Sequence, residues 1–140
     1  MKLEELYETA DKNNIDIYYY PLCHMVSISM PNAVAIDVDN IDTTAEEKEC
    51  LAHELGHCMT GSFYTIGTMN TRGRMEARAN GWAIKKLLPF SELNEAVISG
   101  IYETWDLAEY FELPESFIKT AVHYYVNCRG LKFNDKIAQI

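Results

Sequence analysis

The sequence predicts an α+β protein in which a small N-terminal sheet, antiparallel or mixed, precedes a mainly helical remainder. Three segments near the start are rich in β-favouring residues: 15–20, 25–30 and 33–38. After residue 43, capping residues and apolar positions at helical spacing indicate helices instead. Strands followed by helices, without regular alternation, are typical of the α+β class.

A short helix is expected before the sheet, because apolar residues at positions 3, 6, 7 and 10 fall on one helical face. Turn residues at 12–14 follow it. Pro31 and Asn32 stand between the second and third β-rich segments, where they predict a turn.

The next element is predicted as a helix over 44–60. Two overlapping capping-box patterns begin at Thr43 and Thr44, each with a glutamate three positions later. Gly61 follows the last helical residue, where a left-handed glycine commonly ends a helix. Gly56 inside the helix costs about 1 kcal/mol relative to alanine, so we expect a neighbouring backbone to pass close to it.

This helix carries the most informative motif of the chain, H-E-L-G-H at 53–57. His53 and His57 project from one face about one turn apart, so both imidazoles can reach a single metal ion, with Glu54 beside them. The expected metal is zinc. The alternative is that both histidines are surface or core residues of an ordinary amphipathic helix.

A catalytic zinc usually takes three protein ligands and keeps a position for water, so one more ligand is needed. In the helix predicted over 74–88, Glu76, Asn80, Ala83 and Leu87 share one face, which we expect to point inward. A carboxylate among apolar neighbours needs a metal or another partner, which makes Glu76 the third candidate. Alternatively, it is a solvated glutamate at a helix start. Asn80 could hydrogen-bond the far nitrogen of a zinc-bound imidazole.

Two other residues are weaker candidates for stabilising an oxyanion, Tyr64 in the loop between these helices and His123 near the chain end. A late-helix histidine such as His123 is more often structural. The four cysteines form no C-x-x-C pair, and Cys50 and Cys58 are expected to pack rather than to bind metal.

Length and charge restrict the function further. The 140 residues suit a single domain, 1–140, with no linker or repeat. No signal-peptide pattern or long apolar run appears, so a soluble cytoplasmic protein is expected.

A net charge of -9 disfavours direct binding of nucleic acid or an anionic membrane, and favours a basic protein partner. The helix-turn-helix pattern at 107–122 is therefore interpreted as packing or partner recognition, because acidic residues crowd it.

The segments H-E-L-G-H at 53–57 and M-E-A-R-A-N-G-W-A-I-K-K-L-L-P at 75–89 resemble the ImmA/IrrE family of metallopeptidases. Weaker similarity reaches both ends and covers most of the chain. The resemblance implies a zincin-like, gluzincin-type helical core. It also implies zinc bound by His53, His57 and Glu76, with Glu54 as catalytic base and Asn80 as the asparagine after the ligand glutamate. Gly81 and Trp82 depart from the expected pattern, which concerns packing more than chemistry.

By the same resemblance, the protein is expected to be a zinc-dependent endopeptidase of the small antirepressor type, which cuts a helix-turn-helix repressor encoded by a phage or mobile element. An alternative from another class is a non-catalytic regulator that keeps zinc for structure and binds a repressor through its C-terminal helices. A secreted digestive protease is disfavoured by the missing signal.

Overall fold

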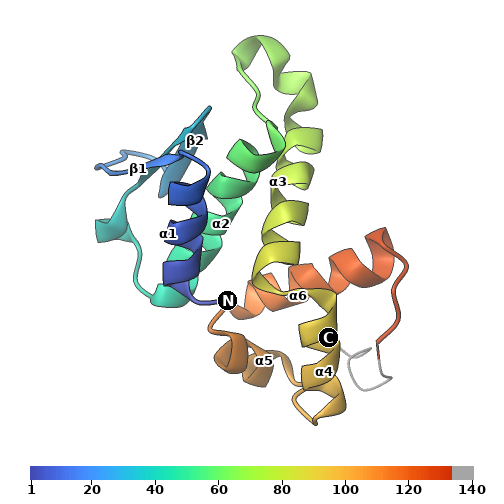
Figure 1. The fold of residues 1–140 in the computed structure, drawn as a ribbon. Helices are drawn as coiled ribbons and strands as arrows, with labels where there is room; N and C mark the ends of the chain where they lie inside the picture. The colour runs from blue at the N-terminus through green and yellow to red at the C-terminus, as the bar shows by residue number, and fades with distance from the viewer. Residues whose placement is uncertain (134–140) are drawn as a thin grey trace.

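The computed structural model describes residues 1–133 and contains a three-stranded sheet and six α-helices in that range (Figure 1). The strands are β1 (Asp16–Tyr19), β2 (Ser27–Met30) and β3 (Ala33–Ile36). The helices are α1 (Leu3–Lys12), α2 (Thr44–Thr60), α3 (Arg72–Leu87), α4 (Phe90–Ile98), α5 (Thr104–Phe111) and α6 (Glu115–His123). Shorter helical turns are η1 (Val38–Asn40), η2 (Ile66–Thr71) and η3 (Tyr124–Cys128).

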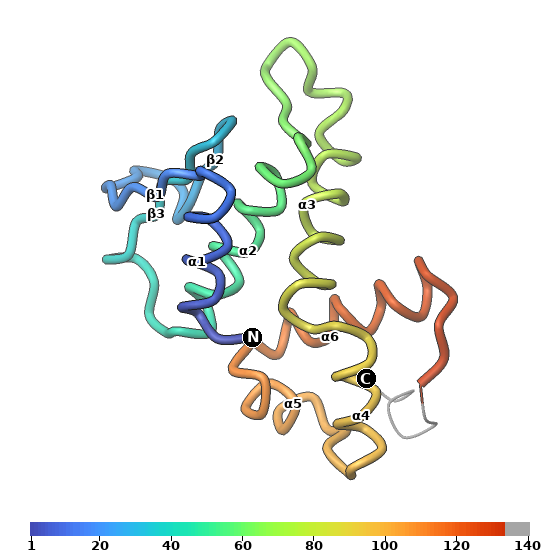
Figure 2. The backbone as a smooth tube through the Cα atoms, viewed as in Figure 1, coloured from blue at the N-terminus to red at the C-terminus, as the bar shows by residue number. Residues whose placement is uncertain are grey.

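The sheet is mixed, which is one of the two arrangements that the sequence predicted. Its order is β1-β3-β2, with β1 parallel and β2 antiparallel to the central β3. Asn32 adopts the left-handed conformation in the tight turn between β2 and β3. Val34 and Ile36 of the central strand are buried, whereas β2 is an edge strand that lies against α2 (Figure 2). The edge strand therefore borders the helix that carries H-E-L-G-H.

The bounds of α2 match the sequence prediction at both ends. The Thr43 hydroxyl accepts a hydrogen bond from the Glu46 backbone N–H at 3.1 Å and caps the first turn. Gly61 follows the helix with φ of 64° and donates its N–H to the carbonyl of His57. These two caps fix the register of the helix.

Helices α2 and α3 run side by side (Figure 1). A Cβ atom at Gly56 would lie 2.4 Å from the carbonyl oxygen of Ala79, so the close backbone approach expected at this glycine is present. The inward face predicted for α3 is only partly correct, because Ala83 and Leu87 are buried while Glu76 is half exposed and Asn80 exposed. The first half of α3 extends beyond the core (Figure 1), and Glu76 and Asn80 there line pockets instead of packing against core side chains.

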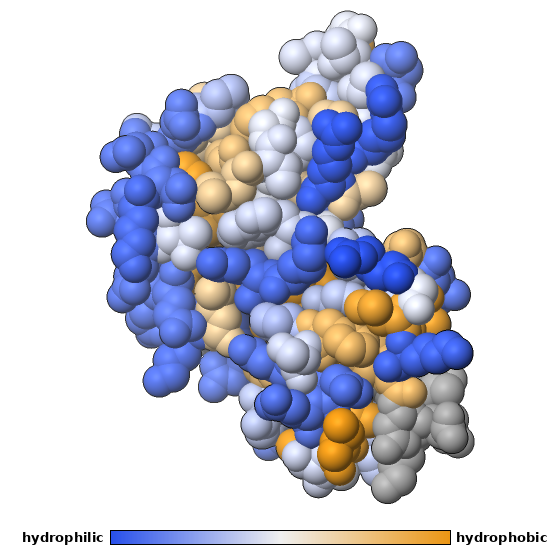
Figure 3. All heavy atoms as spheres, turned by 45° about the vertical axis from the view of Figure 1, so that its right-hand side comes forward, coloured by the Kyte–Doolittle hydropathy of each residue, from blue (hydrophilic) through white to orange (hydrophobic). Residues whose placement is uncertain are grey.

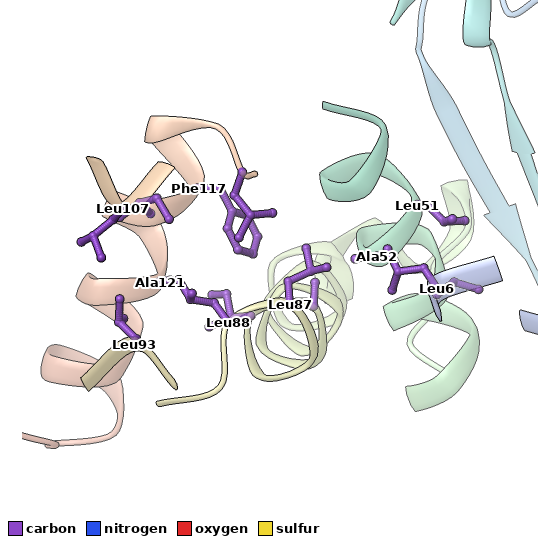
Figure 4. Close-up of a cluster of buried hydrophobic side chains, with 14 of the residues drawn as sticks. Leu6, Leu51, Ala52, Leu87, Leu88, Leu93, Leu107, Phe117 and Ala121 are labelled. Atoms are coloured by element: carbon purple, nitrogen blue, oxygen red, sulfur yellow. The ribbon is translucent and has the colours of Figure 1, made fainter. Parts of the chain in front are cut away.

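The C-terminal part forms helix, turn and helix through α5 and α6, as predicted, with Glu112 left-handed at the turn. Helix α4 was not predicted. Leu87 of α3 lies between the N-terminal side of the core, with Leu6 and Leu51, and the C-terminal side, with Phe117 among others (Figure 4). One cluster of buried apolar residues thus runs through both halves of the described chain.

No helix in residues 1–133 is both long and apolar enough to cross a membrane. Most of the face drawn in Figure 3 is hydrophilic, and its strongest hydrophobic colour lies in the half that contains the C-terminal helices.

Candidate metal centre

Three side chains from α2 and α3 converge at one point. The Nε2 atom of His53 lies 3.2 Å from Nε2 of His57 and 2.9 Å from Oε2 of Glu76. The second oxygen of Glu76 lies 3.4 Å from Nε2 of His57. Within residues 1–133, this is the one group of three or more His, Cys, Asp or Glu side chains close enough to hold an ion. The structure therefore brings together the three residues that the sequence predicted as ligands.

The other nitrogen of each ring has a partner that fixes the ring orientation. Nδ1 of His53 lies 2.8 Å from Oδ1 of Asn80, and Nδ1 of His57 contacts the backbone carbonyl of Ser62. Both partners are oxygen acceptors, so each Nδ1 carries the proton. Each Nε2 then directs a lone pair toward the carboxylate of Glu76. Asn80 lies where the sequence predicted a partner for the far nitrogen of an imidazole.

This arrangement fits a divalent cation. Two imidazole lone pairs and a carboxylate face one another without a proton to share, and such lone pairs repel unless a cation lies between them or the rings take a second proton. In a tetrahedral zinc site the bonds to nitrogen and oxygen are about 2.0–2.2 Å, which places the ligand atoms roughly 3.3–3.5 Å apart. The observed separations of 2.9, 3.2 and 3.4 Å are close to these values. Two histidines and one carboxylate are also a donor set found in catalytic zinc sites.

Glu54 lies beside this group and is 7% exposed. The hydroxyl of Ser27, the first residue of β2, donates a hydrogen bond to Oε1 of Glu54 at 2.8 Å. A hydroxyl donor holds a carboxylate in one orientation. Ser27 was not predicted as a site residue, because only the fold brings β2 to α2.

Tyr64, in the loop between the two helices, also joins the group. Its hydroxyl donates to Oε1 of Glu76 at 2.9 Å. This hydrogen bond to a carboxylate is the main reason that the pKa of Tyr64 is raised, since an ionised phenol could not donate it. The guanidinium of Arg72 lies 5.9 Å from the centre of the Tyr64 ring, a geometry typical of a cation–π contact. No sequence motif surrounds Arg72, so the sequence could not predict that it lies against Tyr64.

The three donors and Glu54 open on one pocket of about 390 Å³. One wall is the edge strand, through Ser27, Ile28 and Ser29, and the opposite side carries Tyr64 and Arg72. Within the described residues, β2 pairs with β3 alone, so its other edge is unpaired. An extended peptide could lie along this edge while one of its carbonyl groups faces the three donors.

Two other histidines are not brought to the pocket. His123 is exposed and its ring pairs with the amide of Asn127, so nothing in the structure supports an oxyanion role for it. His123 is the last residue of α6 and is not among the residues that line the metal pocket. His24 lies in an exposed segment before β2.

Cys58 packs against the β2–β3 turn, where its thiol reaches the carbonyl of Met30 at 3.4 Å.

A family model described as the IrrE N-terminal-like domain, peptidase family M78, matches residues 29–123, which is more than half of the chain. The chain belongs to the ImmA/IrrE family of metallopeptidases. The matched range includes α2 and α3 and therefore all three donors and Glu54, whereas Ser27 lies just before it. Comparison with curated proteins and with solved structures returned no match. The zincin-like character of the helical core accordingly stays a prediction.

Proposed function

We propose that this ImmA/IrrE family member is a zinc-dependent endopeptidase that cuts a helix-turn-helix repressor of a phage or mobile element at a defined bond. The observation that carries the proposal is that Glu54 and the donors His53, His57 and Glu76 open on one pocket, whose wall is an unpaired strand edge. A repressor acts on DNA inside the cell, so the proposal requires a cytoplasmic enzyme.

His53, His57 and Glu76 would hold the zinc ion. When bound, zinc acidifies water and polarises a peptide carbonyl. Glu54 accepts the proton of the water that attacks this carbonyl, and then donates the proton to the leaving amine. Ser27 keeps the Glu54 carboxylate oriented during both transfers. Asn80 and the carbonyl of Ser62 hold the two rings in the orientation that leaves Nε2 free. Tyr64 lines the same pocket and is a candidate hydrogen-bond donor to the developing oxyanion, for which its hydroxyl would turn from Glu76 to the substrate.

We assign substrate binding to β2. An extended segment that adds to its free edge would form main-chain hydrogen bonds beside Glu54, and the sequence alone could not distinguish β2 from the other strands. A cleavage site in an exposed, unstructured linker would meet this requirement. The net charge of -9 is compatible with a basic DNA-binding protein as substrate.

The competing function is a regulator with a structural zinc site. Structural sites usually have four protein ligands, whereas the cluster in residues 1–133 has three. A structural site also has no need of a carboxylate beside its first histidine, held by a hydroxyl from another element. We therefore favour the enzyme.

The test is intact-mass analysis of the helix-turn-helix repressor encoded beside this gene, after incubation with the zinc-loaded protein. The Glu54→Gln variant, with equal zinc content, is the control. Discrete fragments with the wild type alone would support the proposal and identify the bond. Fragments with Glu54→Gln as well would refute the assigned base, and an intact repressor that binds the protein tightly would favour the regulator.

A further inference from the structure

A second pocket of about 320 Å³ lies next to the metal pocket. The two pockets share Ser27 and His53, so they adjoin at the first histidine of the motif. Its size is at the lower end of the range for small-ligand sites. A peptide bond presented to the three donors would therefore have a neighbouring side chain within reach of this second pocket.

The walls of the second pocket are mostly apolar. Ala83 and Ile84 of α3 and Phe117 of α6 are buried core residues, and Cys50 of α2 adds a thiol whose pKa is raised by burial. Thr120 of α6 is a further polar group of the lining. Such walls favour the methylene groups of a side chain over water.

Glu49 is the acidic residue of this lining. It lies one helical turn before His53 and is half buried, yet its carboxylate has no hydrogen bond and no ion pair in the described part of the chain. Burial raises the pKa of Glu49, while the charge of Glu46 adds to this rise and His53 opposes it. No Lys or Arg lines the pocket. A carboxylate in these surroundings is stabilised by any cation that enters.

We propose that this pocket binds a lysine or arginine side chain of the substrate, at one of the two residues that flank the bond cut at the metal centre. The apolar walls contact the stem of that side chain, and Glu49 pairs with its charged end. An acidic side chain is repelled, and an apolar one leaves Glu49 without a partner. This inference rests on the proposed peptidase function.

The first experiment identifies the preferred residues. A peptide library made from a bacterial proteome by cleavage after glutamate keeps internal Lys and Arg, and is incubated with the zinc-loaded protein or with Glu54→Gln. New termini found by mass spectrometry with the wild type alone should be enriched in Lys or Arg at one position beside the cut. Cuts without such enrichment overturn the inference but leave the peptidase proposal intact. The absence of any new terminus contradicts both.

The second experiment measures binding without catalysis. In the Glu54→Gln background, a cleaved library peptide is compared with a copy in which norleucine replaces the basic residue, which removes the charge and keeps the stem. The basic peptide should bind about tenfold more tightly, as expected for one charge-assisted contact. Adding Glu49→Gln should reduce the ratio to near one. Adding Glu109→Gln, the same charge change at an exposed position of α5, should leave it at about ten. Equal ratios in these two double variants would refute the assignment of Glu49.

Discussion

The backbone of α3 passes α2 so closely that a Cβ atom on Gly56 would lie 2.4 Å from the carbonyl oxygen of Ala79. Real Cβ atoms essentially never come so close to a neighbouring oxygen, and a backbone carbonyl cannot move aside like the end of a side chain. The contact sets the distance between the two helices that carry the candidate ligands.

Gly56→Ala should destabilise the protein by about 1–2 kcal/mol and weaken zinc binding. Alanine gains about 1 kcal/mol in helix propensity, but forcing the helices apart costs more and moves Glu76 away from the histidines. Urea unfolding and zinc titration measure the two effects. Gly73→Ala is the control, because a Cβ atom there meets nothing within 4 Å. Gly73→Ala should raise the free energy of unfolding slightly. If Gly56→Ala and Gly73→Ala change stability and zinc affinity equally, the close contact at Gly56 has no effect.

Asn80→Ala should reduce zinc affinity about 10- to 100-fold, because His53 loses the acceptor that orients its ring. Asn80→Asp keeps an oxygen acceptor and should retain most of the affinity. Competition with a chromophoric chelator measures the change. Asn94→Ala on α4 is the matched control. An Asn80→Ala protein with wild-type affinity would mean that the ring needs no such support.

Ser27→Ala should reduce kcat/KM about 10- to 100-fold and leave zinc affinity unchanged. The lost hydrogen bond, 2.8 Å in length, orients the base and not a ligand. Cleavage of a substrate peptide and chelator competition separate the two quantities. Ser91→Ala, at an exposed position of α4, should change neither. Parallel losses of activity and zinc would instead indicate damage to the whole site.

Lys48→Ala should destabilise the protein by about 2–5 kcal/mol, and Lys48→Met by less than about 2 kcal/mol. Lys48 is 2% exposed, and its ammonium donates to the carbonyl of Phe111 at the end of α5 at 2.8 Å. Burial lowers its pKa, so the charge is itself costly. Met fills the space of the stem without that charge, whereas Ala leaves a cavity. Urea unfolding of both variants, with exposed Lys85→Ala as control, distinguishes packing from charge. Equal losses for Ala and Met would assign the effect to the hydrogen bond.

Above pH 10 the wild type should lose stability through Tyr125. This residue is 2% exposed, its hydroxyl donates to the carbonyl of Leu88 at 2.7 Å, and burial raises its pKa to about 12. Between the unfolded pKa, about 10, and about 12, only the unfolded chain ionises, so unfolding becomes easier as the pH rises. At pH 11.5 the loss through Tyr125 amounts to about 2 kcal/mol.

Tyr125→Phe tests this pH dependence. It should be about 1 kcal/mol less stable than the wild type at pH 8, because one hydrogen bond is lost, and should decline less steeply above pH 10. Urea unfolding from pH 8 to 11.5 in the presence of a chelator provides the curves. Tyr110→Phe, an exposed position, should follow the wild type. Parallel curves for wild type and Tyr125→Phe would contradict the assignment.

The sequence predicted those parts of the structure that local chemistry determines. Thr43 and Gly61 mark the ends of α2 because caps act within one turn. The spacing of His53 and His57 is likewise a property of one helix, and Gly56 indicated close packing because a mid-helix glycine has a cost. These features needed no knowledge of the rest of the chain.

Other parts depend on tertiary structure or on weak local signals. Pro89 follows the helix predicted over 74–88 and is also the N-cap of α4, a nine-residue helix without a capping box that no local signal predicted. Ser27 reaches Glu54 from another element, and Ser62 acts through its backbone carbonyl, which any residue type would supply. The exposure of Glu76 and Asn80 depends on how far α3 extends beyond the core.

The three donors come from two separate helices, so an ion that binds them also joins those helices. A ligand that binds only the folded chain raises its stability by about 4 kcal/mol when its free concentration is a thousand times Kd. For zinc bound as proposed, the folded fraction of this protein would then depend on the supply of free metal. Zinc-starved cells would remove the protein faster by proteolysis, and its abundance would follow the metal status of the cell.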